Sequence, residues 1–130
     1  MSKENVEVVQ RAMAAYSTGE PLEDIFHPEI EIWESPELPG EFVGKGYANL
    51  AQGRRSLRDL FEEWSIEVED FFDLGERVLV FVLFRAKGKS SGVPTEGQLA
   101  YLVTLRDGRI IEWCLFGDRA KGLEAAGLAE

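Results

Sequence analysis

The sequence predicts an α+β fold: a few helices packed on a strongly curved antiparallel β-sheet around an apolar pocket. Three observations support this prediction. Apolar residues recur at steps of three and four in the first half of the chain, which is the helical period. The second half consists mainly of long apolar or alternating runs, which is the pattern of strands. The dipeptide Asp107-Gly108 between two such runs is a signal for a tight antiparallel hairpin.

The length and charge of the chain narrow the possibilities. Its 130 residues fit one domain, residues 1–130, and 45% of them are apolar, which is enough for one core. The net charge of −10 repels phosphate backbones and anionic lipid headgroups. We therefore expect no nucleic-acid partner and no membrane partner.

The chain also has features of a cytoplasmic protein. Cys114 is the only cysteine, so no intramolecular disulfide can form. The opening MSKENVEVV lacks a basic start followed by an apolar run, and no apolar run is long enough to span a bilayer. We expect cytoplasmic localisation.

Two helices are expected before the first strand. Ser2 can cap the first, which ends at Gly19 and carries an apolar stripe on one face: Val6, Val9, Met13 and Tyr16. A short second helix is expected over residues 22–26. Pro28 ends it because the residue before a proline is disfavoured in the helical region.

A strand over residues 30–34 and a long third helix are expected next. The strand alternates, with Ile30, Ile32 and Glu34 on one face and Glu31 and Trp33 on the other. The helix, residues 46–64, has a stripe that passes through Arg54 and otherwise consists of Tyr47, Leu50, Leu57, Phe61 and Trp64. An arginine therefore occupies a position on the buried stripe.

Four strands and a short helix complete the chain. The strands are expected over residues 66–72, 78–86, 95–105 and 110–116, and the helix between Asp118, as its cap, and Gly127. Residues 78–84 are apolar at every position, so both faces of the sheet should be covered. In a chain this short the helices can cover only one face. We therefore expect a second copy on the other, giving a homodimer through the sheet face.

Several segments resemble one known superfamily. They are ENVEVVQRAMAAYSTGE, FHPEIEIWESP, FVGKGYANL, SSGVPTEGQLAYLVTLRDGRIIEW and DRAKGLEAAGL. Together they resemble the cystatin-like cone of the nuclear transport factor two superfamily, and most closely its SnoaL-like polyketide cyclase group. The resemblance implies a sheet that wraps around helices to form a cone with an internal pocket. The superfamily includes isomerases, cyclases, dehydratases, epoxide hydrolases and non-catalytic binding domains, so the fold alone does not determine the function.

The ketosteroid isomerase branch of this superfamily implies three candidate catalytic residues. There, a tyrosine late in the first helix and a carboxylic acid on a later strand donate hydrogen bonds to a substrate oxygen, and an aspartate ending the first strand moves the proton. The resemblance puts Tyr16 at the tyrosine position, Glu34 at the base and Tyr101 at the neutral acid. Glutamate and tyrosine replace the two acids of that branch, and Ser35-Pro36 leaves the register at Glu34 open by one residue.

Each candidate has a structural alternative. Burial beside Ile30 and Ile32 would raise the pKa of Glu34 and make it a usable base, whereas a strand that ends earlier would leave it solvated. Arg54 could pair with Glu34 or receive an anionic ligand group, or it could lay its stem on the core and reach water. Tyr16 and Tyr101 fit either ligand contact or core packing.

Apolar residues are expected to line the pocket. The candidate ligand-binding residues besides Arg54 are Trp33, Leu57, Phe61, Trp64 and Trp113. The tryptophans fit a pocket wall and also a dimer interface, since large aromatic side chains dominate both settings.

The sequence predicts no metal site and no cofactor. His27 is the only histidine and cannot form a multi-histidine site, so it is assigned to the turn before the first strand. Cys114 is assigned to the core because no basic residue adjoins it in sequence.

The function expected from these features is binding of a small, mostly apolar metabolite in the cone pocket. Cofactor-free proton transfer of the isomerase, cyclase or dehydratase type could accompany it, with Glu34 as the base and the two tyrosines stabilising an oxyanion. The alternatives are a non-catalytic small-molecule binding module and a dimerisation module.

Overall fold

The computed structural model describes residues 2–18, 23–34 and 43–128, and the α+β prediction is confirmed there. These residues form three helices, α1 (Ser2–Thr18), α2 (Tyr47–Leu60) and α3 (Arg119–Ala125). They also form six strands, β1 (Phe26–Glu34), β2 (Val43–Lys45), β3 (Phe61–Asp73), β4 (Arg77–Gly88), β5 (Pro94–Arg106) and β6 (Arg109–Phe116). None of the described helices is long and apolar enough to cross a membrane.

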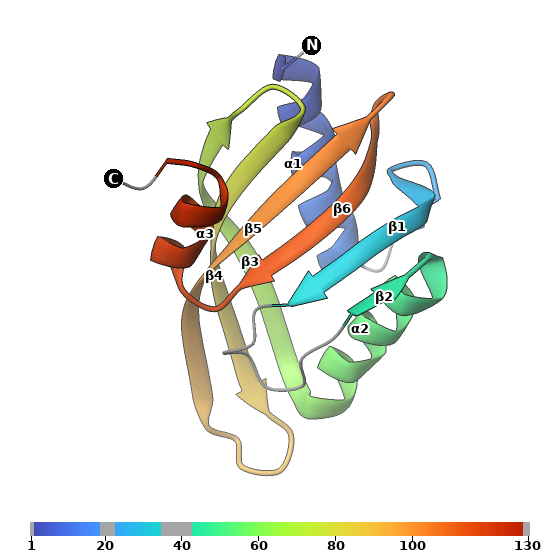
Figure 1. Cartoon of the computed structure of the whole chain (residues 1–130). Coiled ribbons are helices and arrows are strands. Elements are labelled where there is room, and N and C mark those ends of the chain that lie inside the picture. Colours follow the sequence, from blue (N-terminus) through green and yellow to red (C-terminus); the bar gives the residue numbers. More distant parts are fainter. Residues whose placement is uncertain (1, 19–22, 35–42, 129–130) are drawn as a thin grey trace.

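The strands form one curved sheet in the order β2-β1-β6-β5-β4-β3 (Figure 1). All neighbouring pairs are antiparallel except β1 and β6, which run parallel. The prediction of an antiparallel sheet therefore holds for every pairing but this one. The parallel pairing brings the first strand of the chain beside the last.

Both faces of the sheet are packed, as the apolar run in β4 predicted. We call the face against α1 the inner face; its buried residues include Val78, Val80, Val82, Tyr101, Val103 and Trp113, which pack with Val9, Ala12, Met13 and Ala15 of α1. The opposite, outer face has a second cluster formed by Leu79, Ala100, Leu102 and Ala126. Figure 1 shows α1 behind the sheet and α3 in front of it.

The expectation that helices cover only one face is wrong, because α3 covers part of the outer face. The helix approaches the sheet closely at Gly122, where an added Cβ would lie 2.8 Å from the Cβ of Ala100. The expected end residues are confirmed. The side chain of Asp118 accepts a hydrogen bond from the N–H of Ala120 at 2.7 Å, and Gly127 has a φ of 78° just after the helix.

Two arginines attach α3 to the sheet. The guanidinium of Arg119, at its start, donates to the carbonyls of Val82 and Leu99 at 2.9 and 3.4 Å and pairs with Glu69. Arg77 of β4 donates to the carbonyls of Ala125 and Ala126 at the other end, both at 3.4 Å. A positive charge there is also favoured by the helix dipole.

The predicted hairpin at Asp107-Gly108 is confirmed. Asp107 has a φ of 53° and Gly108 a φ of 78°, the combination that a two-residue type I′ turn requires. The turn fixes the pairing of β5 with β6, which begins at Arg106 with Arg109. A bulge at Ile111 then shifts the register by one residue, so that Val103 pairs with Trp113, and this shift brings Tyr101 and Trp113 to the same face.

The short second helix predicted over residues 22–26 is wrong where the structure describes it. Leu22 lies outside the described residues, residues 23–25 form a turn, and Phe26 already begins β1. The N–H of Ile110 donates to the carbonyl of Ile25 at 2.9 Å, so pairing with β6 sets the strand's start. Pro28 is tolerated inside β1 because the β1–β6 register shifts between Phe26 and Glu31.

The third helix is shorter than predicted, and β2 was not predicted. α2 ends at Leu60, and Phe61 and Trp64 belong to β3, where they pair with Gly88 and Ala86. Their spacing of three residues fits the helical period, and the register shift between Phe61 and Glu63 accommodates it in β3. β2 has only three residues and little periodicity of its own.

Candidate functional site

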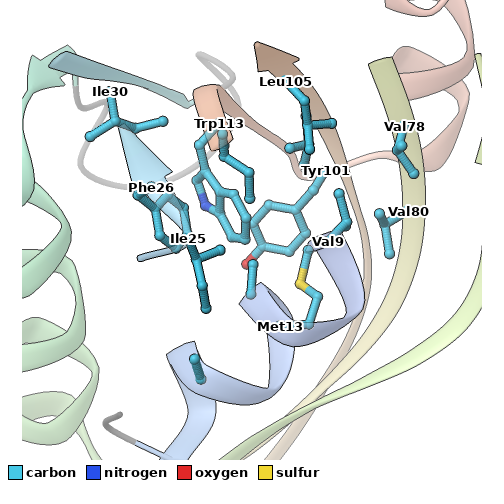
Figure 2. Close-up of a cluster of buried hydrophobic side chains, with 14 of the residues drawn as sticks. Val9, Met13, Ile25, Phe26, Ile30, Val78, Val80, Tyr101, Leu105 and Trp113 are labelled. Atoms are coloured by element: carbon cyan, nitrogen blue, oxygen red, sulfur yellow. The ribbon is translucent and has the colours of Figure 1, made fainter. Parts of the chain in front are cut away.

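Tyr101 and Trp113 are the two predicted site residues that the structure places side by side. Each is 4% exposed, and their ring centroids lie 4.9 Å apart. Phe26 packs edge-on against Trp113 at 5.2 Å. Figure 2 shows the Tyr101 ring between Trp113 and the α1 side chains Val9 and Met13. An aromatic wall therefore lies on the inner face, opposite α1.

A lateral row across the sheet relates Glu34 to Tyr101. Glu34 of β1 pairs with Leu115 of β6, Leu115 pairs with Tyr101 of β5, and Tyr101 pairs with Val80 of β4. Adjacent strands lie about 4.8 Å apart, so the backbones of Glu34 and Tyr101 are about 10 Å apart.

Four further candidates are placed by backbone alone, because their side chains lie outside the described residues. Tyr16 is in the last turn of α1, Glu34 is the last residue of β1, and Arg54 and Leu57 are in α2. Their roles stay predictions.

Phe61 and Trp64 are in β3, not on the helical stripe that was expected to carry them. The ring of Phe61 packs edge-on against Phe84 of β4, with centroids 5.6 Å apart, and both rings are half-buried. Trp64 is half-buried beside Ala86. Both residues lie near the start of β3, the strand that follows directly on α2.

Trp33 is not part of the inner wall. It pairs with Val43 on one side and Cys114 on the other, and its side chain is 43% exposed. Its neighbours in sequence, Ile32 and Ile30, are buried in the inner core, so strand alternation directs Trp33 to the outer face. Of its two sequence-based interpretations, pocket wall and interface residue, this position fits the second.

The structure also has a hollow that the sequence did not indicate. This outer hollow opens to solvent, measures about 260 Å³, and is lined by His27, Glu29, Glu31, Lys45, Arg106, Ile111 and Glu112. It lies where β1, β2, β5 and β6 meet. Sequence periodicity could not reveal it, because it depends on register shifts between strands that are distant in the chain.

Cys114 lies beside this hollow, and its thiol is unreactive at neutral pH. Burial, and then the negative charges of Glu112 and Glu31, raise the pKa of its thiol from 9.0 to about 11. The reactive thiolate is therefore scarce at neutral pH, which agrees with its assignment as a packing residue.

Solved structures share this fold over nearly the whole chain. An NTF2-like protein of Burkholderia xenovorans LB400 is 26% identical, with 97% of each chain covered and a TM-score of 0.77. TerC is 17% identical, covers 95% of this chain and 98% of its own, and has a TM-score of 0.76. A protein of Catenulispora acidiphila DSM 44928 with a ketosteroid isomerase-like fold is 16% identical, with 94% and 93% covered and a TM-score of 0.75.

Sequence comparison gives the family. No curated protein sequence matches the chain. The family model for the SnoaL-like domain matches residues 9–113, which include most of α1, Glu34, Tyr101 and Trp113. This span covers most of the chain, so the protein belongs to the SnoaL-like domain family.

Proposed function

We propose that the protein binds a small, mostly apolar metabolite against the inner face and catalyses cofactor-free proton transfer on it, as an isomerase, cyclase or dehydratase. Glu34 is the base in this proposal. Tyr16 and Tyr101 donate hydrogen bonds to the oxyanion that forms, and the guanidinium of Arg54 pairs with a negatively charged group of the ligand. Leu57, Phe61, Trp64 and Trp113 supply apolar contacts.

The observation that carries the proposal is the row from Glu34 through Leu115 to Tyr101. A separation of about 10 Å between the two backbones is within the span of a small substrate that lies over Leu115 and meets a base at one end and a hydroxyl donor at the other. Residue 34 follows the buried Ile30 and Ile32 at the two-residue spacing of a strand, and the proposal takes its carboxylate to face inward.

The structural relatives support a small-molecule ligand. TerC was co-crystallised with polyporic acid, and the Catenulispora protein is in complex with trimethylamine. These ligands differ widely in size and charge, so they support binding by this fold without specifying a ligand for this chain.

The test is the Glu34→Gln variant, with exchange of α-protons for deuterium in enolisable ketones as the readout. Glutamine keeps the size of the side chain and removes the base, so exchange should fall to the uncatalysed rate while ketone binding survives. Glu67→Gln, a change at an exposed carboxylate on β3, is the matched control and should exchange at the wild-type rate. Exchange by Glu34→Gln at the wild-type rate would overturn the assignment of the base.

A second candidate is a binding module without chemistry. The tight packing of Tyr101 with Trp113 and Phe26 favours it, because a ring locked in the core contributes apolar contact whether or not its hydroxyl meets a substrate. Ligand binding without exchange, in wild type and Glu34→Gln alike, is its signature.

The proposal includes a cytoplasmic homodimer formed through the outer face. α3 covers the part of this face around Leu79 and Ala100, so the second copy would meet the part around the exposed Trp33. Sedimentation at micromolar concentration should give the dimer mass. A monomer would contradict this part of the proposal only, because the inner site is tested separately by the Glu34→Gln variant.

A further inference from the structure

The outer hollow exists because two register shifts meet at one residue. Phe26 pairs with Ile110 and Glu31 with Glu112, so residues 27–30 of β1 stand opposite Ile111 alone. On the other side of β6, Leu105 pairs with Ile110 and Thr104 with Glu112, so Ile111 is also an extra residue against β5. Bulges of this kind open a sheet locally and are frequent beside functional sites.

Two carboxylates lie next to each other at this opening. Glu31 and Glu112 are lateral partners on neighbouring strands, where like charges destabilise the sheet. The hydroxyl of Thr104 donates to Oε1 of Glu112 at 3.0 Å and orients it. The negative charges of both carboxylates oppose ionisation of the Cys114 thiol, so both carboxylates act on the same point of the outer face. A cationic group between them would relieve their repulsion.

Positive groups flank this pair on both sides. Lys45 is the lateral partner of Glu31 on β2, and Arg106 lies on β5, two residues beyond Thr104. Nδ1 of His27 accepts a hydrogen bond from the N–H of Glu29 at 3.0 Å, so in its neutral form the ring carries its hydrogen on Nε2 as a further donor. The half-buried Ile111 adds an apolar surface. The lining thus contains both signs of charge.

We propose that the outer hollow binds a small zwitterion, an amino acid in the broad sense, with its ammonium group against Glu31 and Glu112 and its carboxylate against Arg106. A cation would be repelled by Lys45 and Arg106 and an anion by the three glutamates, whereas a zwitterion meets an opposite charge at each end. The volume of about 260 Å³ is just below that of sites for drug-sized molecules, which suits a compact metabolite.

Other occupants fit this lining less well. The described residues hold no group of three histidine, cysteine or acidic side chains able to bind a metal ion, so the paired glutamates are not accounted for by a metal site. The hollow shares no residue with the lateral row from Glu34 through Leu115 to Tyr101. The proposal therefore does not depend on that row being catalytic.

The test uses three probes on the full-length protein: 4-aminobutyrate, ethylammonium, which carries only the cation, and acetate, which carries only the anion. Titration followed by amide NMR should show saturable shifts in residues 27–31, 106 and 111–112 with 4-aminobutyrate. Its affinity should exceed that of either single-charge probe by about tenfold, since each charge-assisted contact contributes at least that factor.

Variants locate the site and separate binding from folding. Glu112→Gln and the exposed Arg106→Gln should each weaken 4-aminobutyrate binding by about tenfold, and Glu96→Gln, on an exposed carboxylate of the same face, should not. Because Glu112 also bonds to Thr104, Arg106→Gln keeps the test valid if Glu112→Gln unfolds. Equal affinity for 4-aminobutyrate and ethylammonium, or no saturable shift at millimolar concentration, would overturn the proposal.

Discussion

Tyr101 and Trp113 face each other across neighbouring strands, with ring centroids 4.9 Å apart, and both are buried on the inner face. The pair comes from β5 and β6, whose register is set by the Asp107-Gly108 turn and then shifted by the bulge at Ile111. The contact therefore depends on backbone geometry several residues away. Tyr101, which carries an aromatic hydroxyl, also lies in the same lateral row of the sheet as Glu34.

Tyr101→Phe should separate the role of the hydroxyl from that of the ring. The ring keeps its contact with Trp113, so the unfolding free energy in urea should fall by at most about 1.5 kcal/mol, the value of one hydrogen bond. Proton exchange should fall by about 10²–10³ if the hydroxyl stabilises an oxyanion. Tyr101→Ala should cost about 3–5 kcal/mol as a core truncation. An unchanged exchange rate in Tyr101→Phe would assign Tyr101 to the core alone.

Gly122→Ala should destabilise the protein although alanine is the better helix former. The new Cβ would lie 2.8 Å from the Cβ of Ala100, which is short and cannot rotate away, so α3 must shift. Overpacking of this kind costs about 1–3 kcal/mol, more than the gain in helix propensity of at most about 1 kcal/mol. Urea unfolding measures the difference. Gly97→Ala, where an added Cβ meets no atom within 4 Å, is the control and should not destabilise.

Arg119→Met should weaken the attachment of α3. The arginine is 22% exposed, and its removal leaves the carbonyls of Val82 and Leu99 without these donors. We expect a loss of about 1.5–3 kcal/mol of unfolding free energy. Arg85→Met is the matched control on the same face, because Arg85 is 57% exposed and its surface ion pairs contribute about 0–1 kcal/mol. Equal losses in the two variants would show that Arg119 has no special role.

Cys114 gives a pH dependence with a defined sign. The folded protein holds the thiol proton more tightly than the unfolded chain, since the folded pKa is about 11 and the ordinary value is 9.0. Its contribution to stability is fully present below pH 9 and is lost as the pH rises toward 11. The difference in unfolding free energy between wild type and Cys114→Ala should therefore shrink between pH 9 and pH 11. A constant difference would contradict the raised pKa.

Local patterns predicted most of the second half of the chain. The Asp107-Gly108 turn, the apolar run of β4 and the Asp118 cap each depend on chemistry within a few residues, and each lies where expected. The turn alone would pair Tyr101 with Cys114 and direct Trp113 to the opposite face, so the shared face of Tyr101 and Trp113 also needs the bulge at Ile111, which no local pattern predicted.

Features that depend on distant pairing were not predictable. Phe61 and Trp64 are three residues apart, which fits a helical stripe, and only pairing with β4, with a register shift between Phe61 and Glu63, makes them part of a strand. His27 was assigned to a turn because Pro28 follows it, but the bulge between β1 and β6 accommodates the proline inside a strand. The outer hollow arises from that bulge and the bulge at Ile111. Neither leaves a periodic signal in the sequence.

The most direct test of the inner site is an NMR titration of the tryptophan indole N–H signals with cyclohexanone, an enolisable apolar ketone. Single Trp→Phe variants assign the signals. The proposal expects the signal of Trp113, on the inner face beside Tyr101, to shift and saturate, while that of the exposed Trp33 stays unchanged. A saturable shift at Trp33 with none at Trp113 would place the ligand on the outer face and contradict the account.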